Sequence, residues 1–368
     1  MGRRVFVLVA VLAFSMIVPA LAGDLEIHVI DVGWGSSVLV RGADGTTVLM
    51  DSGDKGKGAR FIKPYLESIG MQPDDGIDYT IAGHLHDDHI GGFDEVIGTR
   101  PGLYDVHIQN YYNGSTYTGA SEFTKWRNAA RSTTARRAVV MQVGTRIPLG
   151  EGATLTCVAR NGSVIGGKKV APKDENDRSI AVVIQYGGFD YFWASDMGGG
   201  STDSRCTGRK TDQADVESSV IKAILPGGAH PLISKGGIDV LQVSHHGSES
   251  STNANLVNGA APAVAIISTG DGQRTNFQLP RKVVVDKVLA ARVPCVTVAA
   301  PLVLQTEEGS PRGARTSTKG FSVGNIVIRT DGKATFTIEA DGKVSEGPNE
   351  VAAARLPRTF DIDEVKEP

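Results

Sequence analysis

The sequence predicts an α/β fold in which two β-sheets pack face to face and helices cover their outer faces. Short apolar runs that end in glycine open the chain at Leu25, which is typical of a β-meander. A similar block of strand-like runs begins at Ser179, and both blocks mix strands with helical segments. Two such halves favour a four-layer αββα sandwich, with the functional site along the edge where strand ends converge.

The first half reads as three strands, a helix and a fourth strand. The runs LEIHVIDVG, SSVLVRG and TTVLMDSG each have the length of a strand and end in turn residues. Residues 59–69 carry apolar side chains at helical spacing before Gly70. The segment DYTIAG is then expected to be a strand that leads directly into the run HLHDDH at residues 84–89.

The second half repeats this pattern. Strands are expected at SIAVVIQYGG, DYFWASD, DVLQVSHHG and AVAIIST, with a helix near residues 216–225. Residues 324–340 read as a closing hairpin that turns at Asp331-Gly332. Long loops rich in Gly, Ser, Thr, Lys and Arg are expected at residues 111–140, 162–174 and 198–235. One domain over residues 23–345 is expected, followed by a flexible C-terminal tail over residues 346–368.

The N-terminus predicts export. Arg3 and Arg4 precede an apolar stretch over residues 5–20, and Ala20-Leu21-Ala22 gives a small-x-small cleavage signature, so residues 1–22 read as a signal peptide. The alternative, an uncleaved anchor, would need an apolar run of roughly 20 residues. We therefore expect a secreted or periplasmic protein with no stable membrane insertion after cleavage.

Composition narrows the class of protein and its partners. With 40% hydrophobic and 21% charged residues, the chain fits a soluble globular protein. The formal charge changes from −3 to −5 once Arg3 and Arg4 are removed, so a polyanion could bind only at local patches. No protein partner is predicted. The three cysteines allow one disulfide, whose partners the sequence does not name, and buried structural roles are expected for them.

The run HLHDDH carries the chemistry. His84, His86 and His89 fall within six consecutive positions, and Asp88 lies beside the last. On an extended loop, residues two apart project to the same side, so His84 and His86 can offer imidazoles to one ion while Asp88 and His89 turn toward a second. Imidazole with carboxylate suits zinc, and manganese or iron also fits where carboxylate dominates. The alternative is a solvated polar loop.

The motifs resemble those of a known family. HLHDDHIGG, preceded by IDVGWGSS and VLMDSG and followed by WASDMG and VSHHGS, resembles the metallo-β-lactamase superfamily. Within it, the chain is most similar to the hydrolase domain of DNA-uptake competence proteins of the ComEC type. The resemblance runs from about Glu26 to Ile338, and it implies a metal-dependent hydrolase over residues 23–345.

The resemblance also implies roles for single residues. His84 and His86 would bind the first metal, and Asp88 and His89 the second. From the second half, the implied ligands are Asp196, which would bridge both metals, and His245, which would complete the second site. Asp196 ends the apolar run YFWAS, where a carboxylate is costly unless it is paired or metal-bound.

Other residues are expected around these ligands. Asp51 would hydrogen-bond a ligand histidine. Trp34, where the family has glutamine, would lie at the rim of the site, and His246 could serve as an acid or be structural. Ser248 and Asn276 are candidates for substrate contact or for support of the ligands.

Two departures from the family pattern affect the ligand set. Asn176 stands where many members have a further histidine on the first metal, and asparagine is a weak oxygen ligand. The segment NFQLP, residues 276–280, lacks a histidine that the family often has before the proline. His107 and His230 are alternative candidates, with His107 expected to be structural because it lies in a strand-like run.

Two divalent metal ions would make water a nucleophile, and Asp88 or His246 would protonate the leaving group. We expect a phosphodiester substrate, with DNA as the candidate, because the resemblance is to a domain implied in degrading a DNA strand and because basic residues alternate with aromatics over residues 111–137. A solvated helix face is the alternative interpretation of this segment. The alternatives are a small-ester hydrolase, acting as a phosphorylcholine-type phosphoesterase, lactonase or lactamase, and a metal-free binding module.

Overall fold

The structure is a computed structural model of the 368-residue chain, and it describes residues 23–116, 121–233, 237–273, 277–309 and 320–362. The expected signal peptide, Asn276 and the last residues of the expected tail lie outside this part. Within the described residues, no helix is both long and apolar enough to cross a membrane.

The first sheet contains nine strands in the order β18-β17-β16-β1-β2-β3-β4-β5-β6. Strands β1 to β3 form the expected antiparallel meander, β3 to β6 run parallel, and β16 with β17 forms the expected hairpin. The bounds are β1 Leu25–Val29, β2 Val38–Arg41, β3 Thr47–Met50, β4 Ile77–Ala82, β5 Val106–Tyr112, β6 Ala138–Val140, β16 Ile326–Thr330, β17 Thr335–Ala340 and β18 Arg358–Asp361.

The second sheet follows the order β15-β14-β13-β12-β11-β10-β8-β7, and β9 pairs with β8. Strands β10 and β11 form an antiparallel hairpin, whereas β11 to β15 run parallel. The bounds are β7 Arg146–Pro148, β8 Thr154–Arg160, β9 Ser163–Val164, β10 Ala181–Tyr186, β11 Phe189–Trp193, β12 Val240–Gln242, β13 Val264–Ile267, β14 Leu302–Gln305 and β15 Phe321–Ser322.

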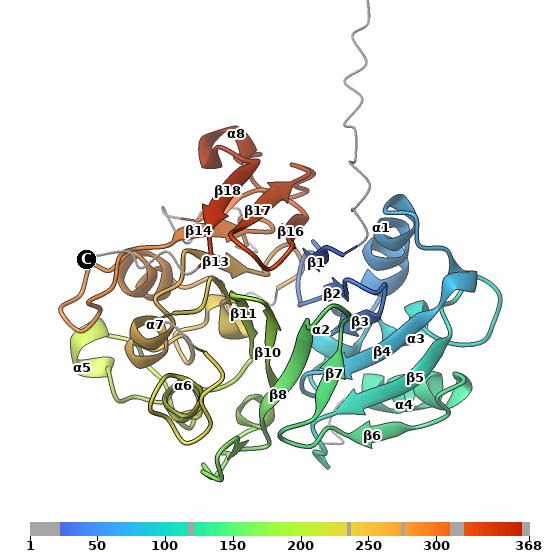
Figure 1. The fold of residues 1–368 in the computed structure, drawn as a ribbon, viewed down its shortest axis with the longest axis horizontal. Coiled ribbons are helices and arrows are strands. Elements are labelled where there is room, and N and C mark those ends of the chain that lie inside the picture. The colour runs from blue at the N-terminus through green and yellow to red at the C-terminus, as the bar shows by residue number, and fades with distance from the viewer. Residues whose placement is uncertain (1–22, 117–120, 234–236, 274–276, 310–319, 363–368) are drawn as a thin grey trace, which may run out of the picture.

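Helices cover the outer faces of both sheets. Figure 1 shows α1, α3 and α4 beside the first sheet and α6 and α7 beside the second, which confirms the expected αββα sandwich. The bounds are η1 Gly58–Ile62, α1 Lys63–Ser68, η2 Pro73–Asp75, α2 Asp87–Ile90, α3 Phe93–Val96, α4 Ser121–Ser132, η3 Asn176–Arg178, α5 Ser204–Thr207, α6 Glu217–Ile224, η4 Ser244–Gly247, α7 Ala254–Ala260, η5 Val283–Leu289 and α8 Val351–Ala354.

The strands are apolar on both faces because both faces are covered. In β2, Val38 and Val40 point into the core between the sheets, whereas Leu39 packs against the helix layer. In β10, Val182 likewise faces the other sheet and Val183 faces the helices. This alternation within a continuous apolar run keeps both sheets rigid and fixes the strand ends that carry the site.

Two expectations on loops and termini are corrected. Residues 111–140 are not one long loop, because α4 buries Phe123, Trp126 and Ala130 at helical spacing and leaves its polar residues other than Glu122 on the solvent side. The expected tail is also wrong over much of its length, since α8 forms there and β18 pairs with β17. Phe360 of β18 is buried and stacks on Phe336. One aromatic in a polar segment is too weak a pattern to reveal a strand.

Candidate metal centre

The run HLHDDH lies at the carboxyl end of β4, within the parallel part of the first sheet. His86 has an extended backbone, with φ −78° and ψ 153°, and α2 begins at the next residue. His84 and His86 therefore precede the helix, and Asp88 and His89 lie on its first turn. This bend brings all four side chains to one edge of the sheet.

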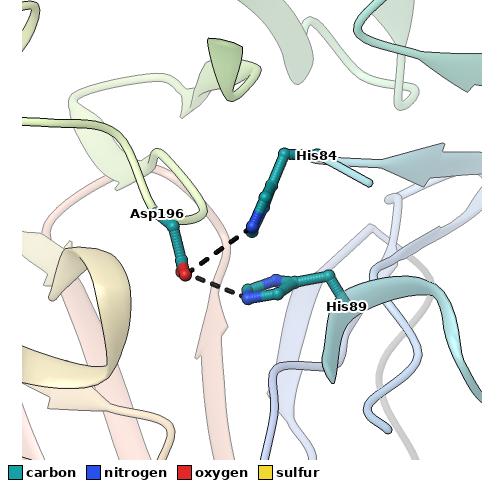
Figure 2. A group of neighbouring side chains, drawn as sticks. All are labelled: His84, His89 and Asp196. Atoms are coloured by element: carbon teal, nitrogen blue, oxygen red, sulfur yellow. Dashed lines mark ion pairs between the residues drawn. The ribbon is translucent and has the colours of Figure 1, made fainter. Parts of the chain in front are cut away.

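The second half supplies residues from three separate segments. Asn176 begins η3, Asp196 follows the end of β11, and His245 and His246 lie in η4 directly after β12. Figure 2 shows Asp196 reaching across from the second half to face His84 and His89 of the first. The cluster therefore exists only when the two sheets are packed together.

The two carboxylate oxygens of Asp196 face different histidines. Oδ2 lies 3.7 Å from His84 Nε2 and 3.5 Å from His245 Nε2. Oδ1 lies 3.2 Å from His89 Nε2 and 3.7 Å from His246 Nε2. Asp196 is 3% exposed, so its carboxylate is shared between two groups of buried nitrogen atoms.

The first group lies on the Oδ2 side. His86 belongs to it, because its Nδ1 lies 2.9 Å from His84 Nε2. Asn176 also lies on this side, with its amide nitrogen 3.4 Å from His245 Nε2. The Oδ1 atom of Asn176 is buried and has no hydrogen-bond partner among the described residues.

The second group contains Asp88, His89 and His246, which lie close enough to hold one metal ion. His246 Nε2 is 3.4 Å from Asp88 Oδ2 and 3.2 Å from His89 Nε2. His246 thus occupies the place expected for His245, which lies on the other side of Asp196. Both residues have left-handed backbones, with φ of 53° and 52°, so their consecutive side chains point to different sides of Asp196. A strand-like interpretation of the motif does not predict this arrangement.

A second set of polar groups contacts the ring nitrogens of the histidines on the side away from the cluster. His84, His89, His245 and His246 each turn Nε2 toward the cluster and engage Nδ1 outside it, an arrangement typical of metal-binding histidines, whereas His86 turns Nδ1 toward His84. The Nδ1 contacts are His84 with Ser195 Oγ at 3.1 Å, His89 with Asp51 Oδ2 at 2.6 Å, His245 with Ser250 Oγ at 2.9 Å and His246 with the Ser268 carbonyl oxygen at 2.9 Å. A carbonyl oxygen can only accept, so Nδ1 of His246 donates and its Nε2 keeps a free lone pair when the ring is neutral.

Burial and neighbouring charges set the protonation states. Burial, with the nearby His89, lowers the pKa of His84 well below its usual value and keeps that ring neutral. Burial alone would raise the pKa of Asp196, but His89, His245 and the other histidines hold it well below its usual value. Neutral imidazole and ionised carboxylate are the forms that bind metal ions.

Strained backbone is concentrated at this site. Asp51, Ser195, His245 and His246 all have positive φ, between 47° and 58°, although none is glycine. Such conformations cost on the order of 1–3 kcal/mol each and persist where the surrounding structure imposes them, which is common at functional sites. Gly35 has φ +117°, and a Cβ there would lie 2.3 Å from the Asp88 carbonyl oxygen, so only glycine fits beside the ligand run.

The remaining candidates differ in how they contact the histidines of the cluster. Asp51 contacts His89 and also accepts a hydrogen bond from the Gly83 amide at 2.8 Å. The Trp34 ring lies 4.7 Å from the His246 ring and stacks on Phe277. The Ser248 hydroxyl contacts the Ser250 hydroxyl, which in turn contacts His245 Nδ1, and the Ser248 amide donates to the His245 carbonyl oxygen at 2.7 Å.

Other expected candidates lie elsewhere. His107 is exposed on β5 beside Asp78, and His230 is exposed in the segment after α6. Neither belongs to the metal-competent groups found among the described residues. Asn276 lies outside the described part of the chain.

Several supporting residues were not predicted from the sequence. Ser195 contacts His84, Asp51 and His89, and its position directly before Asp196 was the signal that could have revealed it. Ser179 Oγ accepts a hydrogen bond from the Asp196 amide. Serine is common in loops, so no single-residue pattern singles out these serines.

The donor set fits divalent metal ions. His89 and His246 Nε2 are 3.2 Å apart, and two such nitrogens can share at most one proton. The same applies to His84 Nε2 and His86 Nδ1. Imidazole nitrogens that converge in this way around a shared carboxylate favour a bound metal cation. A set of imidazole and carboxylate ligands suits zinc, manganese or iron.

An αββα sandwich with such a cluster at its sheet edge defines a class of metal-dependent hydrolases. Residues 30–145 match the family model described as the metallo-beta-lactamase superfamily. This part of the chain therefore carries a domain of that superfamily, which confirms the resemblance drawn from the motifs.

Individual relatives are distant. The chain is 23% identical over 252 residues to Recombination protein 2 of Haemophilus influenzae, a match that covers 67% of this chain and 24% of the relative. The chain thus spans about a quarter of that relative's length.

Similar solved structures include CmlA, a diiron beta-hydroxylase from Streptomyces venezuelae, with 12% identity, a TM-score of 0.37 and coverage of 67% of this chain and 45% of CmlA. Zn(2+)-bound PqqB from Methylobacterium extorquens has 14% identity, a TM-score of 0.32 and coverage of 56% and 58%.

Proposed function

We propose that the protein is an exported, dinuclear-metal-dependent phosphodiesterase that acts as a nuclease. The observation that carries this proposal is the division of Asp196, whose two oxygens face two separate groups of histidines. We assign His84, His86, His245 and Asn176 to one metal ion and Asp88, His89 and His246 to the other, with Asp196 shared.

Two divalent ions at these positions would make water a nucleophile at neutral pH and polarise a phosphoryl oxygen of the substrate. The chain's residues hold that arrangement: Asp51 and Ser195 fix the rings of His89 and His84. Trp34 packs over His246 and limits the access of solvent from that side. His246 uses both ring nitrogens in the site, so we assign it to metal binding rather than to protonation of the leaving group. Burial alone would raise the pKa of Asp88, but His89 and His246 hold it below its usual value, so Asp88 is likewise assigned to metal binding.

The proposed export rests on two features. The N-terminal segment has the organisation of a signal peptide. Cys206 and Cys295 form a disulfide that joins α5 to the segment after η5, and Cys157 is buried as a free thiol. Disulfides form and persist in oxidising compartments, which agrees with a secreted or periplasmic location.

The phosphodiester substrate is supported by the open surroundings of His86. A cavity of about 540 Å³ includes His86, Arg178 and Asn161, so a substrate can approach the metal groups from this side. The name of the Haemophilus relative, a recombination protein, also agrees with nucleic acid as substrate. Small-ester hydrolysis is the second candidate, because Trp34 and the half-exposed Phe277 stack beside His246 and could receive an apolar group.

The test compares two substrates. The mature chain, loaded with zinc or manganese, is incubated with bis-para-nitrophenyl phosphate and with single-stranded DNA, beside the His86→Ala, Asp88→Ala double variant. Metal-dependent cleavage of both substrates, lost in the variant, is the expected result. Cleavage of the small diester alone would favour the small-ester candidate, and no cleavage of either would overturn the phosphodiesterase proposal. The exposed His230→Ala variant serves as the matched control.

A further inference from the structure

A second cavity lies beside the one at His86. It has a volume of about 410 Å³, within the roughly 300–1,000 Å³ typical of ligand sites. The two cavities share Ser115 and Thr116, which follow the carboxyl end of β5. A ligand that fills both would therefore extend from the metal groups past β5 toward α4 and β6, which lie side by side in Figure 1.

The second cavity is lined by three arginines. Arg127 and Arg131 come from α4, and Arg137 directly precedes β6. All three are exposed, and none forms an ion pair or a side-chain hydrogen bond among the residues that the structure describes. Three unneutralised positive charges at one cavity are unusual in a chain whose net charge is −3. They form a local anion-binding surface where the overall charge provides none.

The inner wall of this cavity is aromatic. Tyr112, Phe123 and Trp126 form a connected group, with ring centroids 5.6 Å apart for Tyr112 and Trp126 and 5.8 Å apart for Phe123 and Trp126. The guanidinium of Arg127 lies 5.4 Å from the Phe123 ring centroid, which orients its charge over the ring. Tyr112 is half-buried, so part of its ring faces the cavity. Arginine with accessible aromatic surface is the combination that binds phosphates and stacks bases in single strands.

We propose that this arginine cavity, defined by Arg127, Arg131 and Arg137, binds a backbone phosphate of a nucleic-acid strand whose scissile phosphodiester lies at the metal groups. The proposal rests on the proposed function and names its substrate class. The arginines contact the strand away from the bond that breaks, so they affect the binding of a polymer and leave the hydrolysis of a small diester unchanged. A substrate without remote phosphates has nothing to place in this cavity.

The test measures binding and cleavage separately. The metal-loaded mature chain is titrated into a fluorescent, cleavage-resistant phosphorothioate oligothymidylate, and its anisotropy is followed at several salt concentrations. The variant is Arg131→Ala with Arg137→Ala, two exposed positions. The matched control is Arg292→Ala with Arg355→Ala, which removes the same charge from exposed arginines that line neither cavity. Cleavage of bis-para-nitrophenyl phosphate checks that each variant is folded and active.

The cavity variant is expected to bind the oligonucleotide at least about tenfold more weakly. Its dependence of log K on log salt should be shallower by about 0.7, because each lost phosphate contact on a single strand changes the slope by about 0.7. The control should match the wild type. Equal affinity and slope in the cavity variant, or no binding by the wild type at low salt, would overturn the inference. Failure to cleave bis-para-nitrophenyl phosphate would instead count against the proposed function.

Discussion

The two halves of the molecule contribute to the metal groups in different ways. The first half supplies His84, His86, Asp88 and His89 from one run between β4 and α2. The second half supplies its residues from three segments that are far apart in sequence, at η3, after β11 and after β12. A contiguous run keeps its geometry through one bend, whereas dispersed residues depend on how several loops are fixed. The second half therefore needs more supporting contacts, and errors of assignment are expected there.

The largest effect is expected at His89, a ligand supplied by the first half. Its Nε2 lies 3.2 Å from Asp196 Oδ1 and 3.2 Å from His246 Nε2. His89→Ala should lower kcat/KM for a phosphodiester by about 10⁴-fold, close to 5.5 kcal/mol, because the ion beside Asp196 Oδ1 loses a ligand and the buried Asp51 loses its imidazole partner. Steady-state kinetics with bis-para-nitrophenyl phosphate measure this, beside His107→Ala, which changes an exposed histidine of the same half. If His89→Ala lowers kcat/KM less than His246→Ala does, the ligands of the first half do not contribute more to activity than those of the second half.

The supporting contacts of the second half depend on Arg209. This buried guanidinium pairs with Asp203 and donates to the carbonyl oxygens of Gly200, Glu249 and Ser251. It thus ties the loop that follows Asp196 to the loop that follows the two histidines of η4.

Arg209→Ala should lower the free energy of unfolding by about 3–5 kcal/mol, because it leaves Asp203 buried without its partner. Urea denaturation measures this loss. Arg205→Ala, an exposed arginine in the same loop, should leave the unfolding midpoint unchanged. If the Arg209 variant unfolds at the wild-type midpoint, the loops of the second half are fixed by other contacts.

Alanine substitutions of the two neighbouring histidines of η4 should lower kcat/KM by different amounts. His246→Ala removes a member of the second metal-competent group and should lower kcat/KM by about 10²- to 10³-fold. His245→Ala should cost about 10- to 100-fold, because Asn176 and His86 remain on its side of Asp196. The kinetics of both variants at saturating metal give the comparison. A larger loss of kcat/KM in the His245 variant would instead support the resemblance, which implies that His245 completes the second metal site.

The smallest effect concerns a buried carboxyl group that supports the second half. Glu217 accepts hydrogen bonds from the backbone amides of Thr252 and Asn253, and burial raises its pKa to about 7. The native state therefore keeps a proton on Glu217 that the unfolded chain loses above its ordinary pKa of 4.5. The resulting stability is present below pH 4.5 and is lost as the pH rises through about 7, at a cost of about 3 kcal/mol.

Glu217→Gln imitates the protonated form, so its unfolding free energy should lose less between pH 5 and pH 8 than that of the wild type. Urea titrations of both proteins across this range measure the difference. Parallel pH profiles would show that Glu217 is ionised in the native state throughout.

The sequence predicted the αββα layers and the grouping of the candidate ligands of the first half at one edge of the sheet. Alternating apolar runs and glycine turns revealed the sheets, and the spacing of His84, His86 and His89 revealed the centre. The sides taken by His245 and His246 could not be predicted, because they depend on two consecutive left-handed residues that have no signature in histidine. The strand β18 was missed because its place depends on the edge of β17, which becomes available only when the first sheet has formed.

The central claim, that Asp196 divides two metal positions, is tested most directly by metal stoichiometry. The mature protein, the His246→Ala variant and the His230→Ala control are loaded with zinc or manganese, desalted and measured by inductively coupled plasma mass spectrometry. We expect about two ions per chain in the wild type and the control and about one in the His246 variant. A wild-type protein that retains no metal, or a His246 variant that retains as much as the wild type, would contradict it.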